Sequence, residues 1–270
     1  MVDIFNYIWI FLIFLFLIPV IQQRLLNLRR IAVLKMIEAR RRSRVITLIH
    51  RQERIAFLGI PFSRFIDIED SKDILRAIRL TAPEKPIDLI LHTPGGLVIA
   101  SQQIARALAG HKGKVTVFVP HFAMSGGTLL ALSGDEIAMD KNALLGPLDP
   151  QIENYPAVSI IKAVKDKPIA RIEDKTLIYA DVAKKALRQL DEFVAEILTE
   201  NGQKEEKAKE IAKTLTEGKW THDYPISFKE AFQMGLPVTT DVPKYIYSLM
   251  DLYDQPARSD RSVEYVRDDI

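Results

Sequence analysis

The chain has 270 residues, of which 48% are hydrophobic and 27% charged, with twelve glycines and fourteen prolines. This composition is typical of a protein with its own core, and it excludes collagen, small disulfide scaffolds and wholly disordered chains. There is no cysteine, which excludes thiol nucleophiles, thiolate metal sites and disulfides. The net charge is only +2, and it argues against a basic nucleic-acid-binding surface.

An apolar run from Ile4 to Ile21 opens the chain, and Asn6 is its only strongly polar residue. About eighteen such residues are close to the length needed to cross a hydrocarbon layer of about 30 Å. A cleaved signal peptide would carry positive charge before the run and small residues after it, but here the positive charge follows. We therefore predict an uncleaved transmembrane anchor over residues 1–22.

The next segment is strongly basic, since residues 22–44 carry eight lysines and arginines against the single acid Glu38. Apolar residues recur among them at roughly helical spacing, which predicts a juxtamembrane helix over residues 23–44. The segment is expected to act as a stalk, with a specific lipid or partner site as the alternative. The positive-inside rule places the chain after residue 22 in the cytoplasm, so we expect a single-pass protein of the cell membrane.

From residue 45 onwards, short apolar or β-branched runs alternate with helical patterns. The predicted strands are residues 45–49, 55–60, 87–91, 114–119 and 136–139, and the predicted helices begin near Asp67, Leu97, Thr128 and Asp174. This alternation predicts an α/β fold with largely parallel strands, followed by two long helices that end near Leu215. We expect one domain over residues 45–252 and a polar, disordered tail over residues 253–270.

Two glycine-rich turns carry the candidate chemistry. The predicted strand 87–91 runs into His-Thr-Pro-Gly-Gly at 92–96, where glycines let another group approach the main chain closely. The strand 114–119 is followed by Ala-Met-Ser-Gly-Gly at 123–127, which places Ser125 at a strand-to-helix junction. Together these turns predict acyl transfer, with Ser125 as the nucleophile and amides near Gly95, Gly96 and Gly126 holding the oxyanion.

These two motifs, followed by Asp-Glu-Ile-Ala-Met-Asp and Leu-Gly-Pro-Leu-Asp-Pro-Gln, resemble those of the Clp/crotonase superfamily of serine peptidases. The closest likeness is to the membrane-anchored serine dehydrogenase proteinase family, related to signal peptide peptidase A, and it covers about residues 45–250. The resemblance implies repeated ββα units, a homo-oligomer, Ser125 as nucleophile and an oxyanion hole at Gly95 and Gly96. It also implies a lysine in place of histidine as the general base.

The general base is less well specified than the nucleophile. Asp149 and Pro150 stand where Clp peptidases carry a histidine, so the Ser-His-Asp pattern is not met. In the peptidase A branch the base is a lysine farther along the chain, and the candidates here are Lys162, Lys165, Lys167 and Lys175. We favour Lys175, because Asp174 is predicted to be a helix N-cap and a helix N-terminus lowers the pKa of a lysine. Lys167 is second.

Several alternatives to this assignment stay open. All four lysines can be simply solvated, and His92 or His121, beside the glycine motifs, can serve as the base or have a structural role. Asp149 is expected either to orient a catalytic group or to fix its turn. His222 lies in a later turn, before a helix predicted over 227–234 that Gly235 ends.

No motif for a zinc protease, a P-loop or a dinucleotide site is present, so we expect no cofactor and no metal. The sequence therefore predicts a membrane-anchored serine endopeptidase with a Ser/Lys dyad, which cleaves membrane or membrane-proximal proteins and forms a homo-oligomer. The alternatives are a non-catalytic scaffold of the same fold that forms rings and binds protein partners, and crotonase-like acyl-CoA chemistry.

Overall fold

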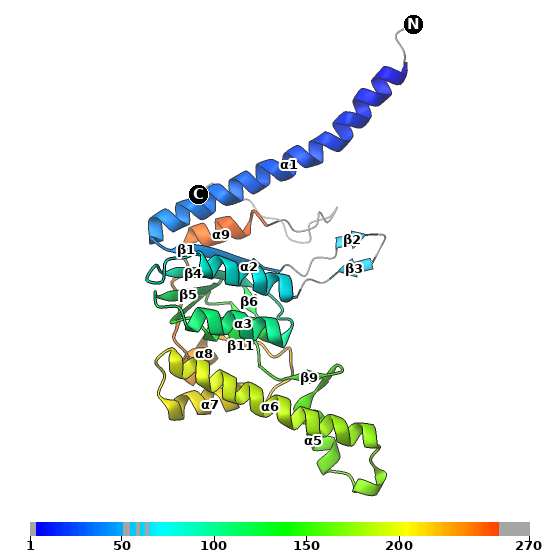
Figure 1. Cartoon of the computed structure of the whole chain (residues 1–270), viewed down its shortest axis with the longest axis vertical. Helices are drawn as coiled ribbons and strands as arrows, with labels where there is room; N and C mark the ends of the chain where they lie inside the picture. Colours follow the sequence, from blue (N-terminus) through cyan, green and yellow to red (C-terminus); the bar gives the residue numbers. More distant parts are fainter. Residues whose placement is uncertain (1–3, 51–54, 58–59, 63–64, 254–270) are drawn as a thin grey trace.

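The structure is a computed structural model that describes residues 4–50, 55–57, 60–62 and 65–253, with the backbone alone for residues 4–16, 55–57 and 60–62 (Figure 1). The helices are α1 Ile4–Arg41, α2 Ile68–Arg79, α3 Val98–Ala109, α4 Gly126–Leu132, α5 Ala157–Lys165, α6 Asp174–Glu200, α7 Glu205–Thr216, α8 Phe228–Met234 and α9 Lys244–Met250, with a 3₁₀ turn η1 at Ile169–Arg171. The strands are β1 Arg44–Ile49, β2 Ile55–Phe57, β3 Ile60–Phe62, β4 Ile87–His92, β5 Val115–Val119, β6 Phe122–Ala123, β7 Glu136–Met139, β8 Leu144–Leu145, β9 Gln151–Ile152, β10 Tyr155–Pro156, β11 Ile226–Ser227 and β12 Val238–Thr239.

A parallel sheet in the order β1-β4-β5-β7-β12 forms the centre of the molecule. Its middle strands β4 and β5 are buried along their whole length, as expected of apolar strands covered on both faces. Helices α2, α3 and α4 make the crossovers between successive strands, which confirms the predicted α/β fold. The apolar stretch predicted as one strand over 55–60 is instead divided between β2 and β3, which pair antiparallel.

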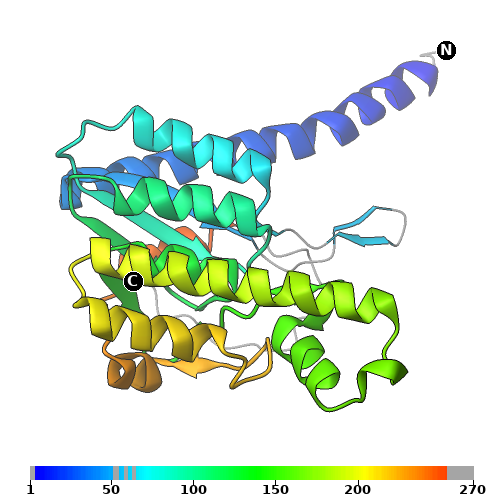
Figure 2. The same cartoon turned by 60° about the horizontal axis from the view of Figure 1, so that its bottom comes forward.

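The two faces of the sheet are covered differently. On one face, α2, α3 and α4 pack on the sheet, and α6 and α7 lie beyond them (Figure 2). On the other face, Ile90 and Phe118 of the sheet pack against the end of α1 and against α9. The end of the chain that the structure describes therefore returns to the first helix (Figure 1).

A smaller sheet in the order β11-β8-β6 lies at the carboxyl end of β5 and β7. Strand β6 follows β5 closely and leads into α4, so that β5, β6 and α4 form one ββα unit. Strand β8 runs parallel to β6, with Ala123 opposite Leu145. This second layer fixes the point at which the chain turns from β6 into α4.

The first helix, α1, is continuous over 38 residues and confirms that the basic segment is helical as far as Arg41. Its end is joined to the sheet, because the Arg41 guanidinium donates to Asp88 of β4 at 2.6 and 3.1 Å, and Ser43 Oγ donates to the same carboxylate. Earlier along α1, Arg30 donates to the carbonyl of Leu252 at 2.8 Å. The helix is therefore attached to the globular part at two points.

The anchor predicted over residues 1–22 falls largely on residues whose side chains lie outside the described part of the chain. Within the part that is described, no helix combines the length and the apolar content that a membrane span requires. The anchor is therefore not confirmed. The tail predicted over 253–270 lies outside the described residues, except for Tyr253.

Helix α5, η1 and the first half of α6 form an arm that projects from the globular part (Figures 1 and 2). The sequence predicts one apolar face along the whole of α6, and its second half does bury Leu190, Val194 and Ile197. In the first half, however, Ile178 and Val182 are 62% and 42% exposed. The predicted apolar face is therefore partly uncovered.

Candidate active site

Ser125 lies between β6 and α4 with φ 50° and ψ −119°. A residue with a Cβ rarely adopts such a backbone conformation, and the conformation persists only where the surroundings impose it. The surroundings here are the amide of Met124, which donates to the carbonyl of Thr93 at 3.0 Å, and the hydroxyl of Thr128, which donates to Ala123 at 2.7 Å. A strained turn from strand to helix presents a serine hydroxyl outward, which is the geometry of a nucleophile elbow.

The Pro-Gly-Gly turn after β4 packs directly on this serine. Gly95 has φ +106°, and a Cβ added there would lie 2.8 Å from the Cβ of Ser125. A Cβ on Gly96 would lie 2.3 Å from the backbone of Ile66, with which Gly96 forms a parallel bridge. Both positions therefore require glycine, and the two turns predicted from the sequence lie side by side.

Two backbone amides face this junction. Among the described residues, neither the N–H of Gly96 nor that of Gly126 has a hydrogen-bond partner. The N–H of Gly95 is different, because it donates to Thr93 Oγ1 at 3.2 Å. Of the three glycines predicted to hold the oxyanion, Gly96 and Gly126 thus offer donors, and Gly95 contributes by its close contact with Ser125.

Ser101, in the first turn of α3, lies beneath the two turns. Its side chain is fully buried, and among the described residues Oγ has no hydrogen-bond partner. A Cβ on Gly126 would lie 2.4 Å from this oxygen and 3.5 Å from the nitrogen of Gly96. Ser101 therefore packs where the two unbonded amides approach each other, a contact that the sequence does not indicate.

A cleft of about 770 Å³ opens beside the Pro-Gly-Gly turn. Its lining comes from the turn, from the start of α2 and from the end of β1, namely His50, Phe65, Ile66, Asp67, Glu69, Asp70, Asp73, Gly96 and Leu97. Asp67 and Asp70 form the capping box of α2, with reciprocal hydrogen bonds of 2.9 Å. The cleft offers space for a chain segment next to the amide of Gly96.

The surroundings of Lys175, the favoured base, differ from those that the sequence predicts. Glu173 occupies the N-cap position of α6 without a hydrogen bond from its side chain to the helix, and Asp174 is the first residue of the helix. The side chain of Lys175 is 68% exposed and pairs with Glu153 at 3.7 Å. A hydrogen bond with Tyr179 and the charge of Glu153 raise the pKa of Lys175, whereas a neutral base needs it lowered. The expected effect of the helix N-terminus is thus outweighed by partners that only the tertiary fold supplies.

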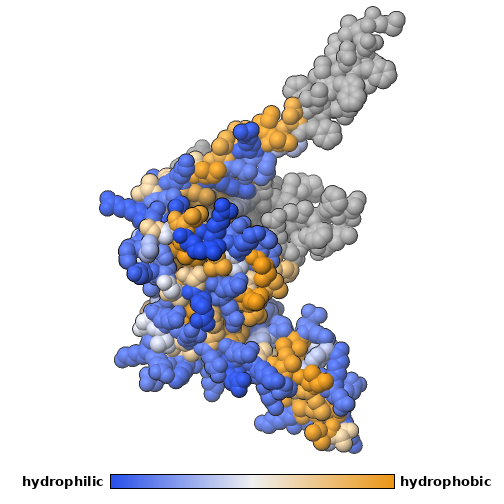
Figure 3. Space-filling model, in the orientation of Figure 1, coloured by the Kyte–Doolittle hydropathy of each residue, from blue (hydrophilic) through white to orange (hydrophobic). Residues whose placement is uncertain are grey.

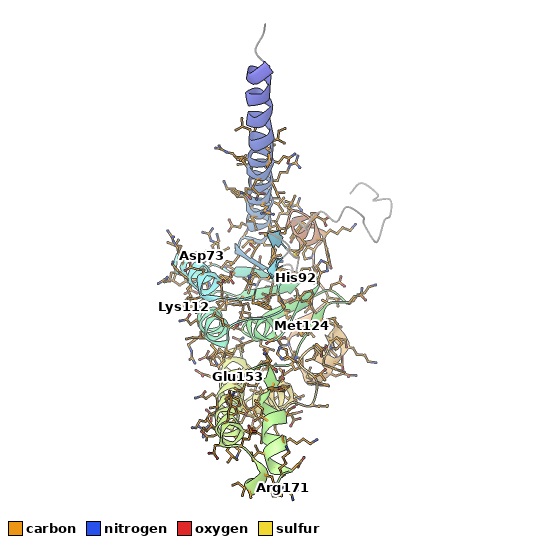
Figure 4. All side chains as sticks on the ribbon, turned by 90° about the vertical axis from the view of Figure 1, so that its right-hand side faces the viewer. Asp73, His92, Lys112, Met124, Glu153 and Arg171 are labelled. Carbon is orange, nitrogen blue, oxygen red and sulfur yellow. The ribbon has the colours of Figure 1, made fainter. Side chains whose placement is uncertain are left out.

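The lysine candidates all lie on or beside the arm. Lys167 is exposed between α5 and η1, and Lys162 and Lys165 are exposed on α5. In Figure 4, Met124, the neighbour of Ser125, lies within the globular part, whereas Arg171 lies at the far end of the arm and Glu153, the partner of Lys175, lies between them. No hydrogen bond between the hydroxyl of Ser125 and any of these lysines occurs among the described residues, and the Ser/Lys dyad stays a prediction.

The structure does pair two residues that the sequence leaves apart. His222 Nδ1 lies 2.6 Å from Asp149 Oδ1, and Gln151 donates to the other carboxylate oxygen at 2.6 Å. The Asp149 side chain is buried, and its hydrogen bond raises the pKa of His222. Nε2 of His222 has no partner among the described residues. A carboxylate that orients an imidazole in this way is the arrangement of a Ser-His-Asp triad.

Asp149 lies in a segment that starts close to Ser125. Strand β8 runs parallel to β6, and Asp149 follows β8 by a few residues, as Ser125 follows β6. Of the other histidines considered, His92 is buried with its ring 4.2 Å from that of Phe122 and edge-on to His121, which favours a structural role for His92.

Comparisons with known proteins show which family the chain belongs to. The sequence model of the ClpP-like SDH-type serine proteinases matches residues 1–269. Two uncharacterized proteins of Methanocaldococcus jannaschii are 54% and 52% identical, over 96% and 98% of this chain and 90% and 89% of theirs. A solved structure of the 1510-N membrane-bound stomatin-specific protease is 21% identical with a TM-score of 0.45, over 69% of this chain and 79% of its own. The chain belongs to the family of ClpP-like SDH-type serine proteinases.

Proposed function

We propose that this protein is a membrane-anchored serine endopeptidase that cleaves membrane or membrane-proximal proteins through an acyl-enzyme on Ser125. The observation that carries the proposal is the strained backbone of Ser125, held against two amides without partners in the described structure. Family membership supports the peptidase activity itself.

The chemistry follows from this geometry. Ser125 Oγ attacks the scissile carbonyl as the base takes its proton, and the carbonyl oxygen becomes negatively charged between the N–H groups of Gly96 and Gly126. Collapse of this intermediate breaks the C–N bond, and the protonated base gives its proton to the leaving amine. Water then attacks the acyl-enzyme with help from the same base, which releases the acid and restores Ser125.

Two kinds of base are proposed for test. The family resemblance favours a lysine, Lys175 before Lys167. For Lys175 this role requires release from Glu153, because that ion pair stabilises the ammonium form. His222 is the second candidate, favoured by the hydrogen bond that Asp149 makes with its Nδ1, since this leaves Nε2 available to take a proton.

The membrane anchor and the homo-oligomer are also proposals. The apolar run at residues 4–21 and the basic segment after it support a single span with the peptidase domain on the cytoplasmic side. Helix α1 connects that run to the sheet without a break. The uncovered apolar side chains of the arm support self-association.

The test is labelling of the full-length protein in detergent with a fluorophosphonate probe. Ser125→Ala is compared with Lys175→Ala, Lys167→Ala and His222→Ala, and the exposed residues Ser159→Ala and Lys185→Ala are matched controls. We expect the wild type and both controls to take label, Ser125→Ala to stay blank, and the variant lacking the base to label at least 100-fold more slowly. A wild type that takes no label in any oligomeric state would contradict the peptidase proposal and favour the non-catalytic scaffold.

A further inference from the structure

His50 lies at the end of β1, beneath the cleft, and it is 5% exposed. Its two ring nitrogens have different partners. Nε2 lies 3.2 Å from Asp70 Oδ2 in the first turn of α2, and Nδ1 lies 3.0 Å from Thr93 Oγ1 in the Pro-Gly-Gly turn. The backbone amide of His50 also donates to the carbonyl of His92 at 2.7 Å. The ring thus joins a carboxylate at the cleft to the turn that packs on Ser125.

The direction of each hydrogen bond follows from the number of protons available. Thr93 Oγ1 accepts the N–H of Gly95 at 3.2 Å, so its single proton is left to donate. The nearer acceptor is His50 Nδ1 at 3.0 Å, compared with the carbonyl of Gly95 at 3.4 Å. A neutral His50 then carries its proton on Nε2 and donates it to Asp70. A chain of hydrogen bonds therefore runs from Gly95 through Thr93 and His50 to Asp70, and each donor in it faces an acceptor.

Asp70 is suited to end this chain as an ion. Burial raises its pKa, but the hydrogen bonds from His50 and from the amide of Asp67 outweigh burial, and the pKa of Asp70 is lowered. An ionised carboxylate accepts a stronger hydrogen bond than a neutral group does. Asp70 therefore fixes the tautomer of His50, and His50 in turn fixes the hydroxyl of Thr93.

This chain matters because two successive glycines leave a peptide group free to rotate. The N–H of Gly95 is held by Thr93, and the carbonyl of Gly95 accepts the amide of Ile66 at 2.8 Å. The peptide between Gly95 and Gly96 is trans, so fixing its carbonyl on Ile66 directs the N–H of Gly96 to the opposite side. The N–H of Gly96 is the group proposed to bind the oxyanion.

We propose that His50 and Thr93 are positioning residues, which hold the N–H of Gly95 and so keep the turn in the conformation in which Ile66 fixes the carbonyl of Gly95 and the N–H of Gly96 faces the substrate. The inference rests on the proposed peptidase function. Loss of either side chain should lower kcat, because rotation of the peptide removes the N–H of Gly96, a donor that acts mainly in the transition state. Ground-state binding in the cleft should change little.

The experiment measures hydrolysis of p-nitrophenyl butyrate by the full-length protein in detergent, with active sites titrated by the fluorophosphonate. Thr93→Val keeps the shape and the backbone bonds of Thr93 but removes its hydroxyl, and Thr93→Ser keeps the hydroxyl. His50→Gln retains a polar group at the Nε2 position, and His50→Asn retains one at the Nδ1 position. Thr81→Val is the matched control, because it also removes a buried hydroxyl that is bonded, to Ala77, far from the turn along α2.

We expect Thr93→Val and His50→Gln to lower kcat by about 10- to 100-fold with KM within about twofold. Thr93→Ser and His50→Asn should retain most of the wild-type kcat, and Thr81→Val should keep all of it. A wild-type kcat for Thr93→Val, or an equal loss in Thr81→Val, would overturn the positioning role while leaving the peptidase proposal intact. A wild type that neither labels nor turns over the ester would overturn both.

Discussion

The site around Ser125 is so closely packed that it requires glycine, which has no Cβ, at positions 95 and 126 as well as the serine hydroxyl. A Cβ on Gly95 would overlap the Cβ of Ser125, and a Cβ on Gly126 would overlap Oγ of Ser101. Glycine at these positions follows from contacts between chain segments that are apart in the sequence. The Ser101 contact gives the clearest test, since it involves one defined pair of atoms.

We predict that Gly126→Ala destabilises the protein by about 1–3 kcal/mol and abolishes labelling of Ser125, because its methyl group would lie 2.4 Å from Ser101 Oγ. The double variant Gly126→Ala with Ser101→Ala should recover most of the stability, since the nearest remaining contact is then 3.2 Å, to the Cβ of residue 101. Thermal unfolding of both variants measures the effect. Gly110→Ala, at a glycine of ordinary φ, is the control, and a double variant no more stable than Gly126→Ala would contradict the argument.

Much of the site could be predicted from residues that are close in sequence. The order of strand, glycine turn and helix predicts that Gly96 and Ser125 lie in turns that precede helices, and helix-capping carboxylates at Asp67 and Asp70 are a local pattern. The partners of Lys175 could not be predicted, because Glu153 reaches it through the tertiary fold. For the same reason the sequence shows neither the chain from Gly95 to Asp70 nor the burial of Ser101.

At the scale of elements, the loop between α7 and β11 meets the segment after β8 through His222 and Asp149. These two residues are 73 positions apart, so no local pattern in the sequence indicates their pairing. The small sheet of β6, β8 and β11 is not predicted either, since each of its strands has only two residues. Helices α5 and α9 are not predicted because neither has the side-chain N-cap and the C-terminal glycine that mark α8. The long central strands β4 and β5 are predicted, because they are buried and mostly apolar, with polar exceptions such as Asp88 and Thr116.

The raised pKa of His222 predicts a pH-dependent contribution to stability. A group whose pKa is higher in the folded state stabilises the fold fully below its unfolded pKa of about 6.5, and the contribution is lost as the pH rises through the folded pKa. Since His222 is 40% exposed, solvent screening limits this contribution to about 1 kcal/mol.

The comparison to make is the free energy of unfolding of the wild type and Asp149→Asn at pH 5.5 and pH 8.5. Asparagine keeps the size of the buried side chain but removes its charge, so the wild type should exceed the variant by more at pH 5.5 than at pH 8.5. His222→Asn should remove the pH dependence in the same way. An identical difference between wild type and Asp149→Asn at the two pH values would show that the ion pair contributes nothing.

At the scale of the whole molecule, the arm carries an apolar surface that the single chain does not cover. Ile169, Ile178 and Val182 are 74%, 62% and 42% exposed, and Figure 3 shows an apolar patch over the arm. Exposed apolar patches bounded by polar residues typically mark protein contacts. In the predicted homo-oligomer, a second copy of the chain would cover this patch.

We predict that Ile178→Lys combined with Val182→Lys lowers the molar mass of the detergent-solubilised protein, because two charges would be placed in the contact between copies. Light scattering coupled to size exclusion measures the change. Gln189→Lys with Thr199→Lys adds the same charge to exposed positions of the second half of α6 and should leave the mass unchanged. A wild type that is monomeric at all concentrations, or a double variant of unchanged mass, would contradict a contact through the arm.

The attachment of α1 to the sheet decides where the chain can be shortened. A fragment that begins at residue 44 would lack Arg41 and Ser43, and the buried carboxylate of Asp88 in β4 would then lose all three of its hydrogen bonds to these side chains. Removing one partner of a buried ion pair is strongly destabilising. It would also remove Ile37, which is fully buried against the sheet. A shortened version of the protein should therefore keep α1 from Arg30 onwards, and be cut before it, where the side chains of Leu25 and Leu28 are exposed.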